Sequence, residues 1–393
     1  MDRIKEFYNR LYLYPNDAHY IQTLCHSLGV KTGEEWRLAA IMGAQELSNT
    51  LPLADYRNFQ NREENDPNFR FNLHMHTHYS DGQFDVKALL DEGEKFAKIR
   101  AKAGSDLPPF VLAITDHDNI DADKEALKII AQHPRKYRHL RVVLGAEISA
   151  VWKDKTLHEI PFEYELIYYG LNPFDENLES YLKQNQQQRQ KIAGLIFESL
   201  NKTYPHLSFS PQEAYEKEPL LEKNLGLGFA GRIYRYAATK VQDEKLYALT
   251  HRFHHTFEAT PDPYQETDDI FDLWHRSGFG FLGVAHPQKT NVGKFLNKDF
   301  IRRCEIEHKD AGYEVMKAFL DTLKGKGLRA LEINYQFDSE SLQQAQQMIL
   351  GEQAADENDG SYRWLKFFIQ YADRYGLLKT GGYDTHKTKI TDR

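Results

Sequence analysis

Histidines and carboxylates gather in five short motifs of this chain, and each motif follows an apolar run. The motifs are His74–Gly82, Thr115–Asp118, Gly145–Glu147, Ala285–Pro287 and Gly382–His386. Imidazole nitrogens and carboxylate oxygens are common protein ligands of divalent metals. No single motif offers enough of them for a metal cluster, whereas five strand ends that converge on one point do. The pattern therefore predicts a multinuclear metal hydrolase.

The spacing within the motifs also suits metal binding. His74 and His76 are two positions apart at a strand end, so both side chains point to one face. Asp384 and His386 repeat this spacing. The strands themselves should be buried, and a buried charge must be paired or bound to metal. The candidate metal ligands are His74, His76, Asp81, His117, Glu147, His286, Asp384 and His386.

Short apolar strands alternate with helical patterns around the first motifs. Strands are expected at 71–74, 110–114 and 141–144, and the first two precede helical patterns at 85–99 and 122–132. This β-then-α rhythm predicts an α/β fold, with a parallel sheet or barrel that carries its site at the carboxyl ends of the strands.

The rhythm stops after Tyr181 and resumes at Phe279, so the block between them is interpreted as an insertion. The predicted division of the chain is a helical N-terminal extension (1–66), a first part of the barrel (67–180), a mostly helical insertion (181–272) and a second part of the barrel (273–393).

Composition narrows the class of protein. The chain has 393 residues, enough for two domains or one large domain with an insertion. Its two cysteines, Cys25 and Cys304, lie far apart, which fits a reducing cytosol and argues against a disulfide framework. We expect a cytoplasmic protein without a membrane partner, because no signal peptide or membrane-spanning run is evident. The net charge of −8 argues against broad binding to nucleic acid.

Taken together, the motifs resemble those of the PHP (polymerase and histidinol phosphatase) superfamily. The HxHTxxSDG pattern of that superfamily is matched by residues 74–82 and its TDHD motif by residues 115–118. Its GxE, AHP and DxH motifs are matched by Gly145–Glu147, Ala285–Pro287 and Asp384–His386. The resemblance covers residues 69–180 and 273–393. It implies a distorted (β/α)7 barrel that holds two or three Mn, Mg, Zn or Fe ions.

The resemblance also divides the ligands among three metals. One metal would be held by His74, His76, Glu147 and Asp384. A second would share Glu147 and be completed by His286 and a mid-chain histidine of the superfamily. The third would be held by Asp81, His117 and His386.

The chain departs from the superfamily at two of these positions. Glu165 stands where the mid-chain histidine is expected, and His158 is an alternative if the intervening loop folds back. A carboxylate in place of an imidazole favours harder ions such as Mn or Mg over Zn, or weakens the second site. Tyr383 replaces a serine that often precedes the final aspartate, and its ring would narrow the site.

A helical insertion at this place resembles the branch of the superfamily that acts on nucleotides. Its members remove the 3′-phosphate from nucleoside 3′,5′-bisphosphates or trim short RNA from the 5′ end. Arg189 matches part of that branch's Arg-rich helix, and Arg232 falls near the position of its histidine. Arginine can clamp a phosphate, and tyrosine can stack on a base. The predicted substrate-binding residues are Arg189, Arg232, Tyr234, Arg235 and Lys289.

The predicted reaction is hydrolysis of a phosphomonoester by a hydroxide held between two metals, with no catalytic residue beyond the metal ligands. The expected partner is a small phosphorylated substrate, a nucleotide or short oligonucleotide, and no large nucleic acid. Two alternatives stay open. One is a phosphatase for a small non-nucleotide phosphomonoester such as histidinol phosphate. The other is a non-catalytic metal-binding module.

Overall fold

The computed structural model describes most of the predicted barrel and part of the insertion. The described residues are 71–104, 110–133, 135–137, 139–159, 161–217, 229–241, 265–277, 280–287, 296–333, 360–382 and 384–386. The predicted N-terminal extension of residues 1–66 lies outside them, as do Lys289 and Tyr383.

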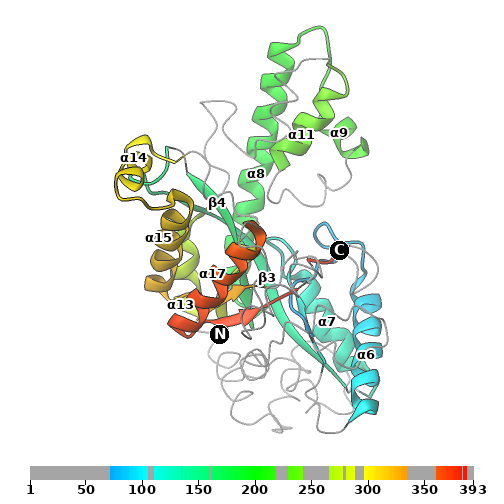
Figure 1. Ribbon diagram of the computed structural model, residues 1–393. Coiled ribbons are helices and arrows are strands. Elements are labelled where there is room, and N and C mark those ends of the chain that lie inside the picture. The colour runs from blue at the N-terminus through cyan, green and yellow to red at the C-terminus, as the bar shows by residue number, and fades with distance from the viewer. Residues whose placement is uncertain are drawn as a thin grey trace.

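Within the described part of the chain, eight strands form one curled sheet (Figure 1). They are β1 (Phe71–Asn72), β2 (Phe110–Ile114), β3 (Leu140–Trp152), β4 (Phe162–Tyr169), β5 (Gln265–Glu266), β6 (Phe281–Val284), β7 (Ala330–Glu332) and β8 (Leu378–Thr380). The spatial order is β1-β2-β3-β4-β6-β7-β8, and the short β5 pairs with β3. The expected strands along the chain are therefore present, and they lie side by side nearly in chain order.

Helices cover the outside of this sheet, and the helices of the insertion stand above it in Figure 1. In the described residues they are α6 (Val86–Ala103), α7 (Asp121–Gln132), α8 (Glu176–Thr203), α9 (Pro211–Lys217), α11 (Phe229–Ala238), α13 (Thr267–Ser277), α14 (Lys298–Ile306), α15 (Ala311–Lys326) and α17 (Gly360–Tyr375). Aspartates begin several of them: the Asp85 carboxylate accepts from the Ala88 N–H at 2.8 Å and caps the first turn of α6. In Figure 1, α6 and α7 lie on one side of the sheet and α13, α15 and α17 on the other.

The strand β4 runs opposite to its neighbours. It pairs antiparallel with both β3 and β6, whereas β1, β2 and β3 are mutually parallel, as are β6, β7 and β8. The reason is the short connection from β3 to β4, which holds no crossover helix; a parallel pair needs one. The amino end of β4, and not its carboxyl end, therefore reaches the edge at which the other strands end.

The two ends of the sheet meet and close the barrel. The Leu73 N–H donates to the Gly381 carbonyl at 3.1 Å, and the His76 N–H donates to the Thr385 carbonyl at 3.0 Å. A glycine is needed at 382, because a Cβ there would lie 2.4 Å from the Cβ of His74. The segment after β8 therefore lies directly against the segment after β1. The predicted α/β fold with a distorted seven-stranded barrel is confirmed.

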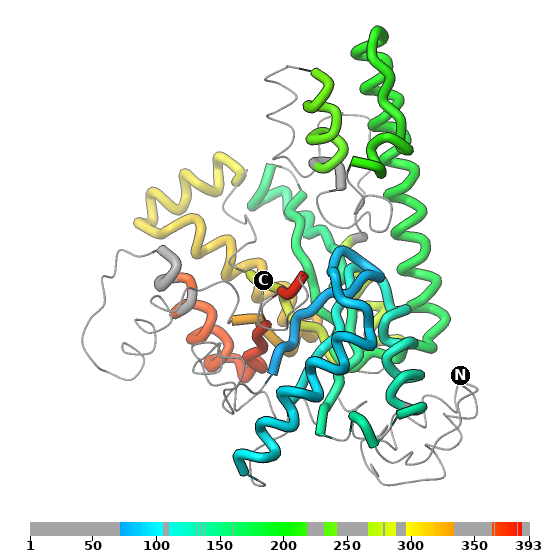
Figure 2. Tube along the Cα trace, turned by 90° about the vertical axis from the view of Figure 1, so that its right-hand side faces the viewer, coloured from blue at the N-terminus to red at the C-terminus, as the bar shows by residue number. Residues whose placement is uncertain are grey.

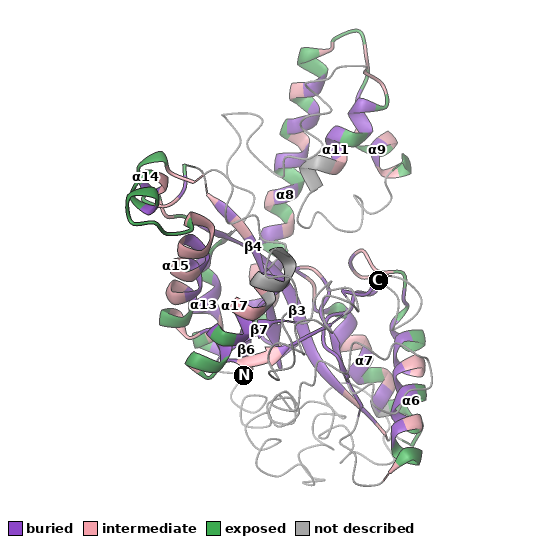
Figure 3. Ribbon diagram, viewed as in Figure 1, coloured by how far each residue is buried: buried purple, intermediate pink, exposed green. Residues whose placement is uncertain are grey.

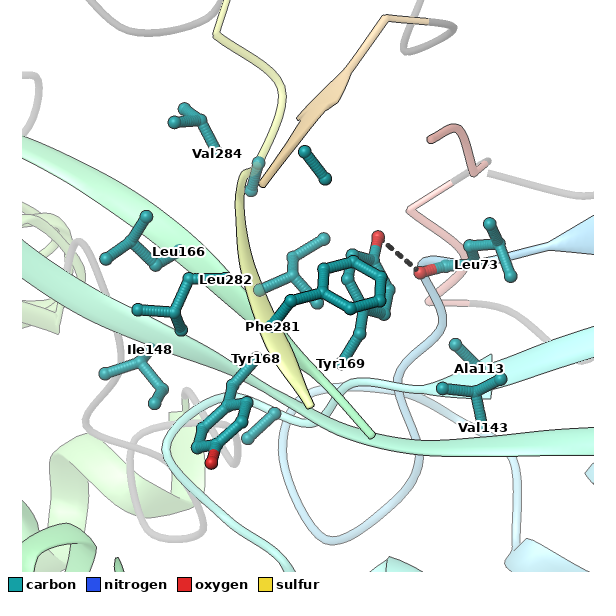
Figure 4. Close-up of a cluster of buried hydrophobic side chains, with 14 of the residues drawn as sticks. Leu73, Ala113, Val143, Ile148, Leu166, Tyr168, Tyr169, Phe281, Leu282 and Val284 are labelled. Atoms are coloured by element: carbon teal, nitrogen blue, oxygen red, sulfur yellow. Dashed lines mark hydrogen bonds between the residues drawn. The ribbon is translucent and has the colours of Figure 1, made fainter. Parts of the chain in front are cut away.

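The barrel interior is apolar. All five residues of β2 are buried, as is most of the sheet (Figure 3). In Figure 4 the rings of Tyr169 and Phe281 lie side by side, with 5.4 Å between their centroids, and have Ala113 and Val143 to one side and Leu166 and Leu282 to the other. The Tyr169 hydroxyl donates to the Leu73 carbonyl at 3.1 Å, so this core also fixes the residue just before His74. Burying such side chains contributes about 1.5–3 kcal/mol each, which makes the strand ends a rigid base for a site.

The insertion has a small core of its own. It is formed by residues of α8 and α11, such as Ile196 and Ile233, by Ala214 of α9, and by Phe209 just before α9. Helix α8 begins at Glu176 and passes residue 181 without a break, and its first turns, with Leu178 and Leu182, pack on the barrel core. Figure 2 shows α8 running from the barrel to the insertion. No described helix is long and apolar enough to cross a membrane.

Candidate metal centre

The structure brings all nine predicted metal ligands into one cluster at the edge where the strands end. The residues come from six of the strands or the segments that follow them: His74 and His76 after β1, Asp81 in the following turn, His117 after β2, Glu147 in β3, Glu165 in β4, His286 after β6, and Asp384 and His386 after β8. Glu165 reaches the cluster because β4 is antiparallel, so that the early part of this strand lies beside the end of β6.

The most buried part of the cluster consists of His74, His76 and Glu147, which we call the closed end. Their side chains are 0% exposed. The Nε2 atom of His74 lies 3.2 Å from Glu147 Oε2 and 3.1 Å from His76 Nε2. The Nε2 atom of His76 also lies 3.1 Å from Asp384 Oδ1. The ligand atoms of His74, His76 and Asp384 all lie within 4.8 Å of one another, and Glu147 Oε2 lies beside both histidines.

Glu147 links the closed end to a second group of ligands. Its Oε1 atom lies 3.0 Å from His286 Nε2, and its Oε2 atom lies 3.0 Å from His117 Nδ1. Glu165 completes this group, with Oε2 at 3.3 Å from His286 Nε2. The alternative ligand lies elsewhere: the His158 ring stacks on Phe162 with centroids 5.5 Å apart. The geometry therefore favours Glu165 over His158 at the mid-chain position.

Asp81, His117 and His386 form the open end of the cluster. Asp81 Oδ1 lies 3.1 Å from His386 Nε2 and 3.6 Å from His117 Nε2. Exposure rises here, to 11% for His117 and 32% for His386. Arg232, from α11 of the insertion, places Nη2 3.4 Å from Asp81 Oδ2. The open end is thus where the insertion and the barrel meet at the cluster.

The cluster has the donor set and the charge that divalent ions require. Four sets of ligand atoms lie within 4.8 Å of one another: His76, Asp81, His117 and His386; His74, His76 and Asp384; His74, Glu147 and His286; and His117, Glu147 and Glu165. Four carboxylates are buried here, and buried anions are costly unless cations compensate them. His76 Nδ1 and Glu147 Oε2 are buried without a hydrogen bond to any described residue. These residues fit divalent metals.

Electrostatics shows how strongly the groups act on one another. Burial alone would lower the pKa of His74, but the carboxylates of Glu147, Glu332 and Asp384 raise it well above its usual value. Burial likewise opposes ionisation of Glu147, yet the neighbouring histidines hold the pKa of this carboxyl well below its ordinary value. The carboxylates thus favour positive charge at the cluster, whether carried by protons or by metal ions.

The backbone around the cluster is held in uncommon conformations. Asp118, His286 and Asp384 have φ values of 45°, 24° and 49°, a region that non-glycine residues rarely adopt. Such strain costs about 1–3 kcal/mol per residue and persists where the surrounding structure enforces it, commonly at functional sites.

The turn after His76 is held by a buried aspartate, Asp116. Its carboxylate accepts hydrogen bonds from the Thr77 N–H at 2.7 Å, the Thr77 hydroxyl at 2.6 Å and the Ser80 hydroxyl. Gly82 is required in the same turn, because a Cβ there would lie 2.2 Å from the carbonyl oxygen of His76. These contacts explain the threonine, serine and glycine of the first motif, and they aim Asp81 at the cluster.

The predicted substrate-binding residues differ in where they lie and in how far they are exposed. Arg232 lies at the open end, and Arg235 is exposed on the same helix. The stacking prediction for Tyr234 is wrong, because its side chain is 1% exposed in the core of the insertion and offers no face to a base. Arg189 is also fully buried and donates from Nη1 to Asp118 Oδ2 at 2.7 Å, so phosphate contact by this side chain is contradicted. Lys289 lies outside the described residues.

Two features of the site were missed in the sequence. Glu332, at the end of β7, contacts His74 and the backbone of His286. Its signal was available, since it follows a buried apolar run as Glu147 does. The second is Asp118, which accepts from Arg189 and from the Ser149 hydroxyl at 3.1 Å. The sequence placed Asp118 in the second motif but gave no sign of its contact with Arg189, because this partner on α8 lies far away in the sequence.

Comparison with known proteins gives two similar curated sequences. The chain is 26% identical over 247 residues to the 5′-3′ exoribonuclease Rnm of Salmonella typhimurium, a match that covers 61% of this chain and 73% of the relative. It is 25% identical over 248 residues to Rnm of Escherichia coli, with the same coverage of both chains. No protein-family model matches the chain.

Two solved structures are also similar. One, from Bifidobacterium adolescentis, is described as a metal-dependent phosphoesterase; it has a TM-score of 0.46, 19% identity and coverage of 80% of this chain and 87% of its own. The other is an amidohydrolase from Chromobacterium violaceum with bound sulfate and no metal, with a TM-score of 0.46, 18% identity and coverage of 81% and 88%.

The motifs, the nine converging side chains and the curated relatives agree with one another. The exoribonuclease name belongs to enzymes that cleave phosphoesters, and the cluster offers the ligands of a metal-dependent hydrolase. The predicted resemblance of this chain to phosphoesterases is confirmed by its similarity to these two exoribonucleases, and with it the prediction that the chain is a hydrolase.

Proposed function

We propose that this chain hydrolyses phosphoesters of nucleotides or short oligonucleotides, with two or three divalent ions bound to the nine clustered ligands. The observation that carries the nucleotide part is Arg232. This residue comes from the insertion, and its guanidinium lies 3.4 Å from a carboxylate oxygen of Asp81 at the open end. An insertion that places an arginine beside the metal ligands is suited to orient a phosphorylated substrate there.

Three ligand sets would hold the ions. His74, His76, Glu147 and Asp384 would form the first, and Glu147, Glu165 and His286 the second. Asp81, His117 and His386 would form the third. Glu165 gives the second set two carboxylates, which favours Mn or Mg over softer ions. Bound ions of this kind acidify water and neutralise the charge that develops on a phosphoryl group.

The substrate is expected to approach from the open end. His74, His76 and Glu147 are closed to solvent, whereas His386 is 32% exposed and Arg232 23% exposed. Arginine carries five N–H donors in a planar fork, so the contact of one nitrogen with Asp81 leaves others for a phosphate. Arg232 would thus hold the substrate phosphate while the ligand cluster acts on the neighbouring ester.

The identity of the curated relatives supports a nucleotide or RNA end as the substrate. Both are named 5′-3′ exoribonucleases, and the matched region spans 73% of their length. An RNA end and a nucleoside bisphosphate have one feature in common, a phosphate close to a second phosphoester. Arg232 would bind the phosphate, and the cluster would act on the phosphoester beside it. The expectation that only small substrates are used therefore requires a direct test.

The deciding experiment compares substrates with metal-stripped protein to which Mn, Mg or Zn is added back. We expect metal-dependent cleavage of 3′-phosphoadenosine 5′-phosphate or of a short 5′-phosphorylated RNA, and slow or no release of phosphate from histidinol phosphate. Preference for histidinol phosphate would favour a small-molecule phosphatase instead. Tight metal binding without turnover of any substrate would favour a non-catalytic module.

A further inference from the structure

Glu332 is a buried carboxylate that contacts the metal centre from behind. It ends β7, and its side chain is 0% exposed. Both of its carboxylate oxygens lie 3.1 Å from Nδ1 of His74. Its Oε2 atom also accepts a hydrogen bond of 2.7 Å from the backbone N–H of His286. One carboxylate thus touches two predicted ligands that come from opposite parts of the sheet.

The position of Glu332 around the His74 ring shows that it does not compete for the ion. The two ring nitrogens point to different sides, and Nε2 faces Glu147 at 3.2 Å and His76 at 3.1 Å. Glu332 lies at Nδ1 instead, and it belongs to none of the ligand groups found among the described residues. Its contact therefore orients the imidazole and leaves Nε2 to the cluster.

The contact with His286 acts on the backbone. His286 has a φ of 24°, an uncommon conformation for a residue with a side chain. A buried backbone N–H is destabilising unless an acceptor compensates it, and Glu332 supplies an acceptor here. The 2.7 Å hydrogen bond compensates this N–H and helps to keep the His286 ring aimed at Glu147, 3.0 Å away.

We propose that Glu332 is a positioning residue of the metal centre, which holds the His74 proton on Nδ1 and fixes the backbone of His286. The Nδ1–H of His74 then donates to Glu332, and the lone pair of Nε2 is free for an ion. The inference rests on the metal-binding part of the proposed function and is independent of the substrate. A carboxylate behind a metal-binding histidine fixes its tautomer and raises its basicity.

The test is the substitution Glu332→Gln in the full chain, with binding of Mn²⁺ measured by titration calorimetry in the absence of substrate. The amide of glutamine has nearly the same size as the carboxylate. Its NH2 group, however, would face either His74 Nδ1–H or the His286 N–H and cannot accept a hydrogen bond from it. We expect affinity at the sites that use His74 and His286 to fall by about tenfold to a hundredfold. The site of Asp81, His117 and His386 should change less, because Glu332 contacts none of these side chains in the described structure.

A matched control is Glu94→Gln on α6. Glu94 is also a buried carboxylate, 2% exposed, that accepts from two backbone N–H groups, of His139 at 3.2 Å and of Leu140 at 3.0 Å. It lies outside the cluster, so this variant should lose thermal stability and keep the Mn²⁺ affinity of the wild type. A second readout is the ¹⁵N NMR spectrum of the His74 ring in metal-free protein at a pH above the raised pKa of His74, where the ring is neutral and Glu332→Gln should shift its tautomer balance.

The outcomes separate this inference from the proposed function. If Glu332→Gln binds Mn²⁺ as the wild type does and the His74 tautomer is unchanged, the positioning role is overturned while the metal centre stands. If the wild type itself binds no ion, the proposed function fails, and this inference fails with it. Should Glu332→Gln not fold, Glu332→Asp retains the charge with a shorter reach, and wild-type affinity in that variant would equally contradict the role.

Discussion

The two ends of the cluster differ in what surrounds them. The side chains of His74, His76 and Glu147 at the closed end are 0% exposed and stand on the strands of the barrel. At the open end, Asp81, His117 and His386 are 8%, 11% and 32% exposed, and the nearby cation is Arg232 of the insertion. The same kinds of ligand are thus held rigidly by the barrel at one end and reached by the insertion at the other.

This difference assigns separate tasks to the two ends. Ions bound at the closed end would be shielded from water, so their interactions with the carboxylates would be strong and their exchange slow. The open end is accessible to a substrate, and its ligands share a contact with an arginine that can bind phosphate. We expect the barrel to determine metal binding and the insertion to determine substrate choice.

The largest effect is expected from His76→Ala. His76 belongs to the closed end and also faces the open end: Nε2 is 3.1 Å from Asp384 Oδ1, and Nδ1 is 3.8 Å from Asp81 Oδ1. Its loss should reduce turnover of any phosphoester to background while the far-ultraviolet circular dichroism spectrum stays that of the wild type. His133→Ala, at an exposed position that ends α7, is the control. Wild-type turnover by His76→Ala would refute the metal assignment.

His386→Ala should have a smaller effect that is confined to the open end. This side chain is the most exposed of the three ligands there, and it contacts Asp81 at 3.1 Å. We expect the variant to bind one ion fewer per chain than the wild type while the closed end keeps its ions. Metal content measured by mass spectrometry tests this. Loss of all ions would show that the two ends are not separate.

Arg232→Ala should change substrate binding and leave the metals in place. Removing a charged hydrogen bond to phosphate costs about 1.5–3 kcal/mol, which corresponds to an increase in KM of about tenfold to a hundredfold for a nucleotide. Hydrolysis of a generic aryl phosphate should change little. Lys202→Ala, at an exposed position in the last turn of α8, is the control. An equal increase in KM for both kinds of substrate would argue against the phosphate clamp.

The smallest of these effects is expected on thermal stability, because removal of the metal should lower the melting temperature only modestly. The four buried carboxylates of the cluster repel one another once the ions are gone, although the neighbouring histidines can take up protons and compensate in part. An ion present at a hundred times its Kd stabilises the fold by about 2.7 kcal/mol. Thermal unfolding with Mn²⁺ and with chelator measures this difference. Identical melting curves would mean that the cluster holds no ion under those conditions.

The sequence predicted the barrel and the convergence of its ligands, because local patterns carry both. Alternating apolar strands ended at each motif, so the meeting of residues as distant as His74 and Asp384 followed from fold class alone. The choice between Glu165 and His158 stayed open, because it depends on the direction of β4. That direction is set by how β3 and β4 pair and is not visible in the strand pattern.

The insertion was harder to predict, since its helices pack on one another without a strand pattern to guide them. Arg189 and Tyr234 were predicted to contact the substrate, and both are buried by contacts between distant segments. A single chain gives no sign of which helix face will be covered. Arg232 lies beside the cluster, and the sign of this in the sequence was its place in a segment that resembles a superfamily motif.

The most direct test of the account is an anomalous diffraction map of crystals soaked in Mn²⁺. The account predicts strong peaks between His74, His76 and Asp384 and between Glu147, Glu165 and His286, with a weaker peak at Asp81, His117 and His386. Peaks only at other positions, or no peak at the closed end, would contradict the claim that these ligands form a multinuclear metal centre.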